Sequence, residues 1–171
     1  MNAKKKKVLL LTDMEHRIEP IIQQVTNIPR ENMLTIHSCD SVIVHPFGDI
    51  MRSIIIAIYQ ENVEEIVVVG IEDKETNVVN LQIQRDSIKN NKELDYLFEN
   101  CMPEFSSGSL EEWLSGKENV SENIEKSIDM IRHHPLVPSN VKVHGFIIDK
   151  TGGKKETVVK VSVNKVAECM N

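Results

Sequence analysis

Apolar runs alternate with segments of helical periodicity along most of this chain. Residues 7–12, whose centre is the apolar run 8–11, and the apolar run 66–69 are bounded by charged or small residues, which is typical of strands buried on both faces of a parallel sheet. Residues 33–37 are a further strand candidate. Residues 50–59 are apolar on nearly all sides, which predicts a helix buried between the sheet and a neighbour. A strand, a helix and a strand with short connections form a right-handed βαβ unit, so the pattern predicts an α/β fold.

Helical periodicity recurs in other parts of the chain. In residues 121–133 isoleucines are spaced four and three residues apart, which predicts a helix with one apolar face. Residues 18–25 predict a short helix, with Pro20 tolerated in its first turn. Three weaker candidates are residues 78–89, residues 92–100 and a segment that begins at the capping-box pair Ser109 and Glu112.

Two segments near the carboxyl end predict strands. Residues 141–148 alternate at first and then become apolar, as in a core strand, and residues 156–163 alternate throughout, as in an antiparallel edge strand. Gly152 and Gly153 between them indicate a hairpin turn. We find no internal repeat or linker. The prediction is a single domain over residues 1–171, with a three-layer α/β/α fold, a mostly parallel sheet and an antiparallel edge strand.

Composition narrows the functional classes. The net charge of −6 argues against general affinity for nucleic acid, and no apolar run reaches the ~18 residues of a membrane span. The three cysteines, Cys39, Cys101 and Cys169, are widely spaced without a C-x-x-C pair, which argues for a reducing compartment. The lysine-rich start lacks an apolar signal core. We therefore expect a cytoplasmic protein, with no membrane insertion.

Several segments, taken in order, match one known family. Residues 45–53, His-Pro-Phe-Gly-Asp-Ile-Met-Arg-Ser, are similar to the family's helix after its second strand, and residues 63–70 are similar to the strand that delivers its metal ligands. Residues 110–114 are similar to a later segment. The best match is residues 134–138, His-Pro-Leu-Val-Pro, with residues 141–149. By their order and spacing together, the chain is identified as a member of the β-class carbonic anhydrases.

The resemblance implies a zinc enzyme. Family members hold zinc through a Cys-x-Asp-x-Arg loop after the first strand and a Gly-His-x-x-Cys-Gly loop after the third. Zinc keeps a fourth position for water and lowers the pKa of that water, so that hydroxide can attack carbon dioxide and form bicarbonate. The family's Asp–Arg pair orients the water or an acid ligand.

This chain departs from the pattern at every ligand position. Asp13 stands at the first cysteine, Ile71 at the histidine and Lys74 at the second cysteine. Ile71 offers no lone pair and Lys74 is a cation, so most of the ~10–16 kcal/mol of a complete zinc site should be lost. We expect no zinc cofactor and no carbon dioxide hydration.

Other residues of the loops suggest what replaces the metal. Asp13 and Lys74 are expected to form an ion pair in the vacant site, which need not add stability because burying charges is costly. Glu15 and Arg17 could form a second, vestigial acid–arginine pair. Cys39 lies where the family has a small Asn-Ala-Gly segment, and we interpret it as a small buried residue.

A rearranged metal site remains an alternative. Residues expected near the carboxyl ends of the strands could supply it: Asp13, His16, His37, Cys39, Glu72 and Asp73. The remaining histidines have simpler interpretations. His45, His134 and His144 lie in family segments with roles in helix packing and turn formation, and His133 is expected at an exposed helix end.

Three functions are compatible with these residues. The first is a binding or regulatory homologue of carbonic anhydrase, with bicarbonate or another small anion held by Arg17, Lys74 and backbone N–H groups. The second is an active carbonic anhydrase with a rearranged metal site. The third is another enzyme that uses Glu15 or Asp13 as a general base. The resemblance implies a helical arm before the first strand; we expect this chain to lack that arm and to form a homodimer with a reduced interface.

Overall fold

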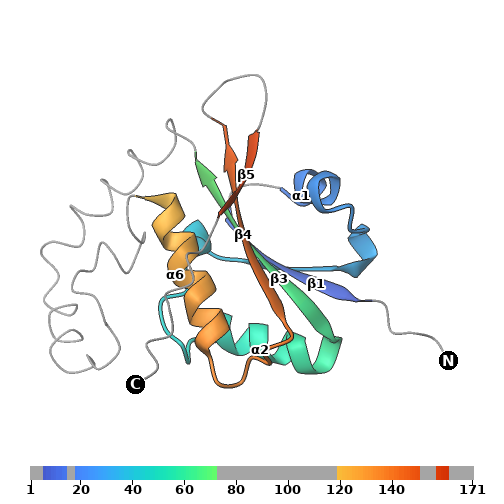
Figure 1. The fold of residues 1–171 in the computed structure, drawn as a ribbon, viewed down its shortest axis with the longest axis vertical. Helices are drawn as coiled ribbons and strands as arrows, with labels where there is room; N and C mark the ends of the chain where they lie inside the picture. Colours follow the sequence, from blue (N-terminus) through green and yellow to red (C-terminus); the bar gives the residue numbers. More distant parts are fainter. Residues whose placement is uncertain (1–5, 15–17, 73–118, 151–156, 162–171) are drawn as a thin grey trace, which may run out of the picture.

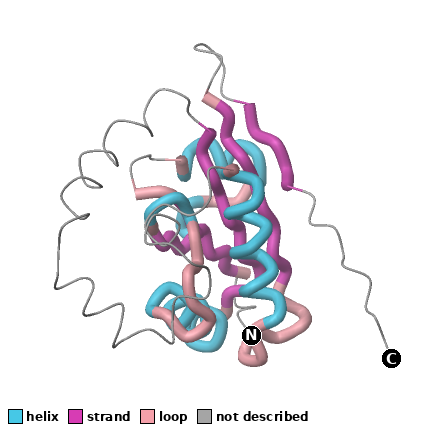
Figure 2. Tube along the Cα trace, turned by 90° about the vertical axis from the view of Figure 1, so that its left-hand side faces the viewer, coloured by secondary structure: helices cyan, strands magenta, loops and turns pink. Residues whose placement is uncertain are grey.

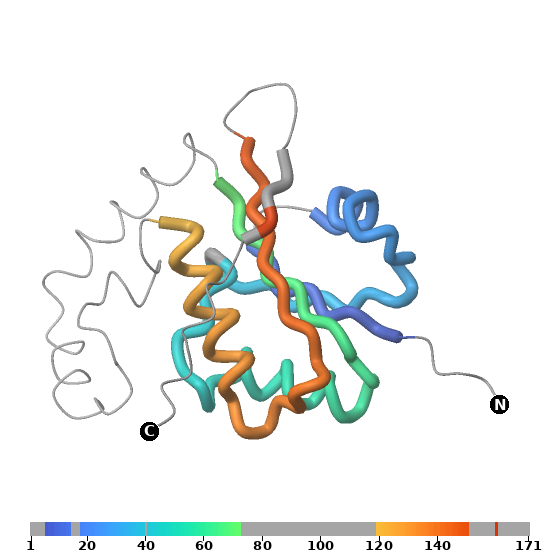
Figure 3. Tube along the Cα trace, viewed as in Figure 1, coloured from blue at the N-terminus to red at the C-terminus, as the bar shows by residue number. Residues whose placement is uncertain are grey.

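The computed structural model describes residues 6–14, 18–72, 119–150 and 157–161, which build one five-stranded sheet. The strand order is β2-β1-β3-β4-β5, with parallel pairing between the first four and antiparallel pairing of β5 to β4. Figure 3 traces β3 between β1 and β4. The predicted edge strand is confirmed. The strands are β1 (Lys7–Thr12), β2 (Met33–His37), β3 (Val63–Glu72), β4 (Lys142–Asp149) and β5 (Thr157–Val161).

Helices pack on both faces of this sheet, as predicted (Figure 1). Helix α1 (Glu19–Thr26) contributes to the apolar cluster on one face. Helices α2 (Asp49–Glu61) and α6 (Val120–His133) contribute to the cluster on the opposite face. Figure 2 shows α6 running alongside the strands. Two short 3₁₀ helices, η1 (Arg30–Asn32) and η2 (Cys39–Ser41), flank β2.

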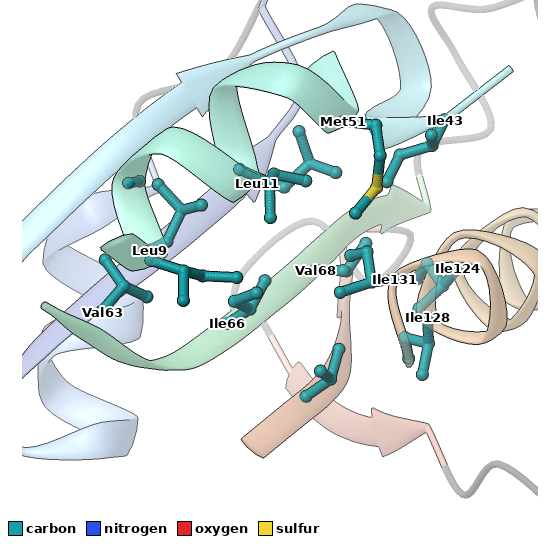
Figure 4. Packing of buried hydrophobic residues seen from close by; sticks show 14 residues of the cluster. Leu9, Leu11, Ile43, Met51, Val63, Ile66, Val68, Ile124, Ile128 and Ile131 are labelled. Atoms are coloured by element: carbon teal, nitrogen blue, oxygen red, sulfur yellow. The ribbon is translucent and has the colours of Figure 1, made fainter. Parts of the chain in front are cut away.

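The α2–α6 face holds the larger core (Figure 4). Alternate residues of β1 and β3 point to it, because successive side chains of a strand face opposite sides of the sheet. The isoleucines spaced four and three apart on α6 meet them, which confirms the predicted apolar face of that helix. The labelled residues are Leu9, Leu11, Ile43, Met51, Val63, Ile66, Val68, Ile124, Ile128 and Ile131.

Helix α6 packs tightly against β3 at Gly70. A Cβ atom on Gly70 would lie 2.5 Å from Val120 Cγ1 and 2.7 Å from Ile124 Cδ1. These distances leave no room for a side chain. Glycine at this position therefore lets the first turn of α6 pack directly on the carboxyl end of β3.

Strand β3 is longer than the apolar run predicted. It continues to Glu72, paired with Asp149 of β4, so Gly70, Ile71 and Glu72 belong to the strand and not to a loop after it. It also begins earlier, at Val63. The acidic residues there are tolerated because they reach partners at the sheet's periphery: Glu64 lies 2.9 Å from Lys6 Nζ.

Helix α2 differs from its prediction in burial. Met51, Ile54, Ala57 and Ile58 are buried, but Ile55 and Ile56 are only half-buried and Tyr59 is 63% exposed. The helix is thus buried on its sheet side only. No helix in the described ranges is long and apolar enough to span a membrane.

Local signals set the helix ends. Helices α1 and α2 end at Asn27 and Asn62, whose positive φ angles of 56° and 60° place them in the left-handed region that asparagine tolerates. Helix α6 begins at Asn119, whose side chain accepts hydrogen bonds from the N–H groups of Ser121 and Glu122. The other predictions, helices over 78–89, 92–100 and after Ser109 and the turn at Gly152–Gly153, lie outside the described residues.

Candidate functional site

The carboxyl ends of β1, β2 and β3 bring several of the predicted site residues to one edge of the sheet. Strand β1 lies between β2 and β3, so Asp13, which follows β1, is central. His37 ends β2, Cys39 begins η2 and Glu72 ends β3. This edge is where open α/β sheets bind their ligands.

His37 connects the loop after β1 to helix α1. Its Nδ1 lies 3.2 Å from the carbonyl oxygen of Asp13, and since a carbonyl can only accept, His37 is the donor. Its Nε2 lies 3.8 Å from a carboxylate oxygen of Glu19 on α1. The Nδ1 hydrogen bond therefore ties the loop after β1 to the end of β2, and Glu19 of α1 lies on the other side of the imidazole. Glu15 and Arg17 lie outside the described residues, so their pairing stays a prediction.

Asp13 and Ile71 occupy different environments. Asp13 is half-buried. Ile71 is 8% exposed and belongs to the apolar cluster of the α1 face, with Ile18, Val69 and Ile148. The position of the family's histidine thus carries an aliphatic side chain packed among others. Lys74 lies outside the described residues, so an Asp13–Lys74 ion pair also stays a prediction.

Cys39 corrects one interpretation. It is exposed, not buried. The backbone N–H of Ser38 donates to the carbonyl of Thr12 at 2.9 Å, and the chain then turns away from the sheet through η2. The residue that this turn buries is Ser41, which is 0% exposed.

Ser41 is part of a hydroxyl network that sequence reasoning missed. Its Oγ donates to the carbonyl of Val69 at 2.5 Å, and Ser127 Oγ of α6 donates to the carbonyl of Ser41 at 3.2 Å. Ser127 Oγ in turn accepts from the N–H of Ile43 at 3.1 Å. The signal that could have revealed this network is Ser127, a serine on the otherwise apolar face of residues 121–133. These bonds fasten η2 to β3 and α6 beside the candidate site.

Two other buried hydroxyls lie at the same edge. Thr12 Oγ1 and Ser38 Oγ have no hydrogen-bond partner within the described residues. Thr12 is 0% exposed and Ser38 is 7% exposed. Both adjoin the loop positions that the resemblance assigns to the site.

Two of the three histidines in the family segments, His45 and His134, form turns as predicted, whereas His144 lies within strand β4. His45 Nδ1 accepts a hydrogen bond from the N–H of Phe47 at 3.0 Å, and His134 Nδ1 accepts one from Leu136 at 3.2 Å. Each of these two histidines is followed by a proline. Its imidazole Nδ1 accepts the hydrogen bond that a backbone carbonyl would accept in an ordinary tight turn. His133 is exposed at the end of α6, as expected.

The donor set does not fit zinc. Zinc in proteins takes thiolate, imidazole or carboxylate ligands. Of the positions that the resemblance assigns to ligands, Asp13 supplies an oxygen and Ile71 supplies nothing. The described residues also contain no group of three His, Cys, Asp or Glu side chains arranged to hold a metal ion. The rearranged cluster suggested by the sequence therefore does not form among its described members.

Comparison with known proteins decides the family. The chain is 54% identical over 166 residues to the Bacillus subtilis (strain 168) protein named "Putative carbonic anhydrase-like protein YbcF", covering 96% of this chain and 93% of YbcF. The chain belongs to the β-carbonic anhydrase family. No protein-family model matches it.

Solved β-carbonic anhydrases share the fold. Isoform I from Trichomonas vaginalis superposes with a TM-score of 0.65 at 21% identity, covering 92% of this chain and 84% of that protein. A chain from the crystal structures of two tetrameric β-carbonic anhydrases of Sordaria macrospora superposes with a TM-score of 0.53 at 13% identity, covering 92% of this chain and 81% of that one.

Proposed function

We propose that this chain is a non-catalytic β-carbonic anhydrase homologue that binds no zinc, does not hydrate carbon dioxide and acts as a binding or regulatory protein. One observation carries the proposal: Ile71, at the position of the family's histidine ligand, is buried in the apolar cluster of the α1 face. An aliphatic side chain cannot donate an electron pair, so the tetrahedral ligand set is incomplete.

The charges at the other positions support the same conclusion. Lys74, at the second cysteine position, brings a positive charge that repels a metal cation. Asp13 alone supplies an oxygen. A complete structural zinc site contributes about 10–16 kcal/mol, and one carboxylate beside an ammonium group cannot retain much of it. An Asp13–Lys74 pair would take the place of the metal.

The ligand that suits such a site is bicarbonate or another small anion. Arg17 and Lys74 carry the positive charges and backbone N–H groups of the loops add donors, as in other anion-binding concavities. Glu15 and Arg17 would keep the family's acid–arginine pair, but this pair would have no metal-bound water to orient. Binding without turnover is the expected behaviour.

The test combines metal analysis with a hydration assay on purified protein. We expect no stoichiometric zinc and no acceleration of carbon dioxide hydration. The triple variant D13C/I71H/K74C should regain zinc, whereas the double variant D13C/K74C, which keeps Ile71, should not. Stoichiometric zinc with rapid hydration in the unaltered protein would overturn the proposal and favour a rearranged metal site.

We also propose that the single domain assembles as a homodimer through the outer side of α2. Phe47, Tyr59 and Leu136 are 74%, 63% and 50% exposed, and they lie near one another: the Phe47 ring is 5.3 Å from that of His134, and Tyr59 Oη donates to the carbonyl of Leu136 at 2.9 Å. Large exposed apolar groups gathered in one place are typical of interfaces. Sedimentation should give a dimer, and Tyr59→Lys should shift it towards monomer; a monomeric unaltered protein would contradict this.

A further inference from the structure

Two turns of the same construction carry exposed apolar side chains beside α2. His45 and His134 each begin a turn in which a proline comes next and the N–H three residues on donates to the histidine carbonyl, at 3.1 Å and 2.9 Å. The N–H of Phe47 donates to His45 Nδ1 at 3.0 Å. The N–H of Leu136 donates to His134 Nδ1 at 3.2 Å. The turns thus present Phe47 and Leu136, 74% and 50% exposed, on the face proposed above for the homodimer.

These contacts fix the protonation state of both imidazoles. A backbone N–H can only donate, so Nδ1 of His45 and of His134 offers its lone pair and carries no hydrogen. A protonated imidazole has a hydrogen on both nitrogens and accepts no hydrogen bond. His133 bonds in the opposite sense, because its Nδ1 lies 2.8 Å from the carbonyl oxygen of Asp129 and must donate. Protonation therefore breaks the first two contacts and leaves that of His133 intact.

His134 is the less able of the two to accommodate a proton. It is 4% exposed, its ring forms an edge-to-face pair with Phe47 at 5.3 Å between centroids, and its Nε2 is buried without a hydrogen-bond partner in the described chain. A charge placed there is costly to bury unless it is paired. Because the Phe47 ring and the Leu136 N–H both contact this imidazole, and Tyr59 Oη donates to the Leu136 carbonyl at 2.9 Å, movement of the imidazole disturbs the whole face (Figure 1).

No carboxylate in the described chain pairs with either imidazole. The charged and titratable groups on the elements that adjoin the two turns are Asp49, Arg52, Tyr59 and Glu61 of α2, Asp129, Arg132 and His133 of α6, and Lys142 of β4. Among the described residues none of them forms an ion pair with His45 or His134. The contrast is His144, whose Nε2 lies 3.4 Å from a carboxylate oxygen of Glu65. A proton on His134 thus has no counter-charge to hold the ring in place.

We propose that His45 and His134 make this dimer face acid-sensitive: the face is ordered while both imidazoles are neutral and loosens when they take up a proton. The inference rests on the homodimer proposed above and names how its assembly is regulated. The sign follows from linkage, because the ordered turns hold only the neutral imidazole, so proton uptake favours the open turns and the monomer. Assembly is complete above the ordinary histidine pKa of about 6.5 and weakens as the pH falls below it.

Sedimentation of the intact protein at about pH 7.5 and about pH 5.5 tests the inference in the range where histidine changes charge. The dimer dissociation constant should rise several-fold at the lower pH. Asparagine accepts a nearby backbone N–H through its side-chain oxygen and does not titrate. The double variant His45→Asn/His134→Asn should therefore dimerise equally at both pH values. His133→Gln, at the exposed end of α6, should keep the rise of the unaltered protein.

The two pH values separate the two proposals. A monomer at the higher pH would overturn the homodimer and this inference with it, whereas equal dimer affinity at both values would overturn this inference alone. So would an undiminished rise in the double variant. NMR of the imidazole nitrogens in the unaltered protein at about pH 7.5 adds a test that needs no variant. Nδ1 of His134 should carry no hydrogen and Nδ1 of His133 should carry one; a hydrogen on Nδ1 of His134 would refute the inference.

Discussion

The two faces of the sheet differ in the size of their apolar cores and in how their buried hydroxyls are hydrogen-bonded. Among the described residues, fourteen buried side chains form the cluster beneath α2 and α6, and eight form the cluster beneath α1. The buried hydroxyls beside the larger cluster, those of Ser41 and Ser127, are both hydrogen-bonded to backbone groups. On the α1 face Thr12 Oγ1 has no partner in the described chain.

This difference suggests that one face mainly stabilises the fold and that the other carries the candidate site. The α2–α6 face is a closed core, whereas the α1 face combines a smaller core with Ile71, the His37–Glu19 contact and the His144–Glu65 pair. The candidate site, whose residues differ from the family's metal ligands, therefore lies on the face with the smaller apolar core. We expect substitutions on the first face to act mainly on folding and those near the ligand positions of the second face to act also on binding.

The largest expected effect compares two isoleucines that are both 0% exposed. Ile128→Ala on α6 should lower the free energy of unfolding by about 2–5 kcal/mol, because it leaves a cavity in the larger core. Ile22→Ala on α1 should fall at the lower end of that range, since a two-turn helix can shift to fill the space. Denaturant unfolding measures both. Equal losses would mean that the two faces are equally rigid.

Gly70→Ala should have the next largest effect. The added methyl group would meet Val120 at 2.5 Å and Ile124 at 2.7 Å, and such overpacking costs about 1–3 kcal/mol. Thermal unfolding would detect it. Val120→Ala removes the nearer obstacle, so the double variant should be more stable than the sum of the single losses predicts. Strict additivity would show that α6 does not press on Gly70.

The smallest effect concerns the helix caps. Asn119 caps α6 through two backbone N–H groups, whereas Ile18 at the start of α1 offers no side-chain cap. Asn119→Ala should cost about 1 kcal/mol. Ser121→Ala, which removes only a half-buried contact with Glu125, should cost a few tenths of a kcal/mol. If both variants unfold at the same denaturant concentration, the cap does not stabilise α6.

Sequence reasoning succeeded where burial is periodic. The bounds predicted for β1 and β2 agree with the structure, and the helices that became α1, α2 and α6 were located to within two residues at each end. It failed where a partner element decides the outcome. Strand β3 runs beyond its apolar residues because β4 continues to pair with it as far as Asp149. Cys39 is exposed because η2 turns the chain there, and a small apolar residue alone does not reveal that turn.

The sequence by itself determined the order of strands and helices, the family segments and the chemistry available at Asp13, Ile71 and Lys74, because these depend on residue type and spacing. Only the tertiary structure decided that Ile71 is buried beneath α1, that His37 fastens the loop after β1 and that His144 lies beside Glu65. Each of these depends on which strands become neighbours. Neighbours in a parallel sheet are brought together by crossovers that the local pattern does not specify.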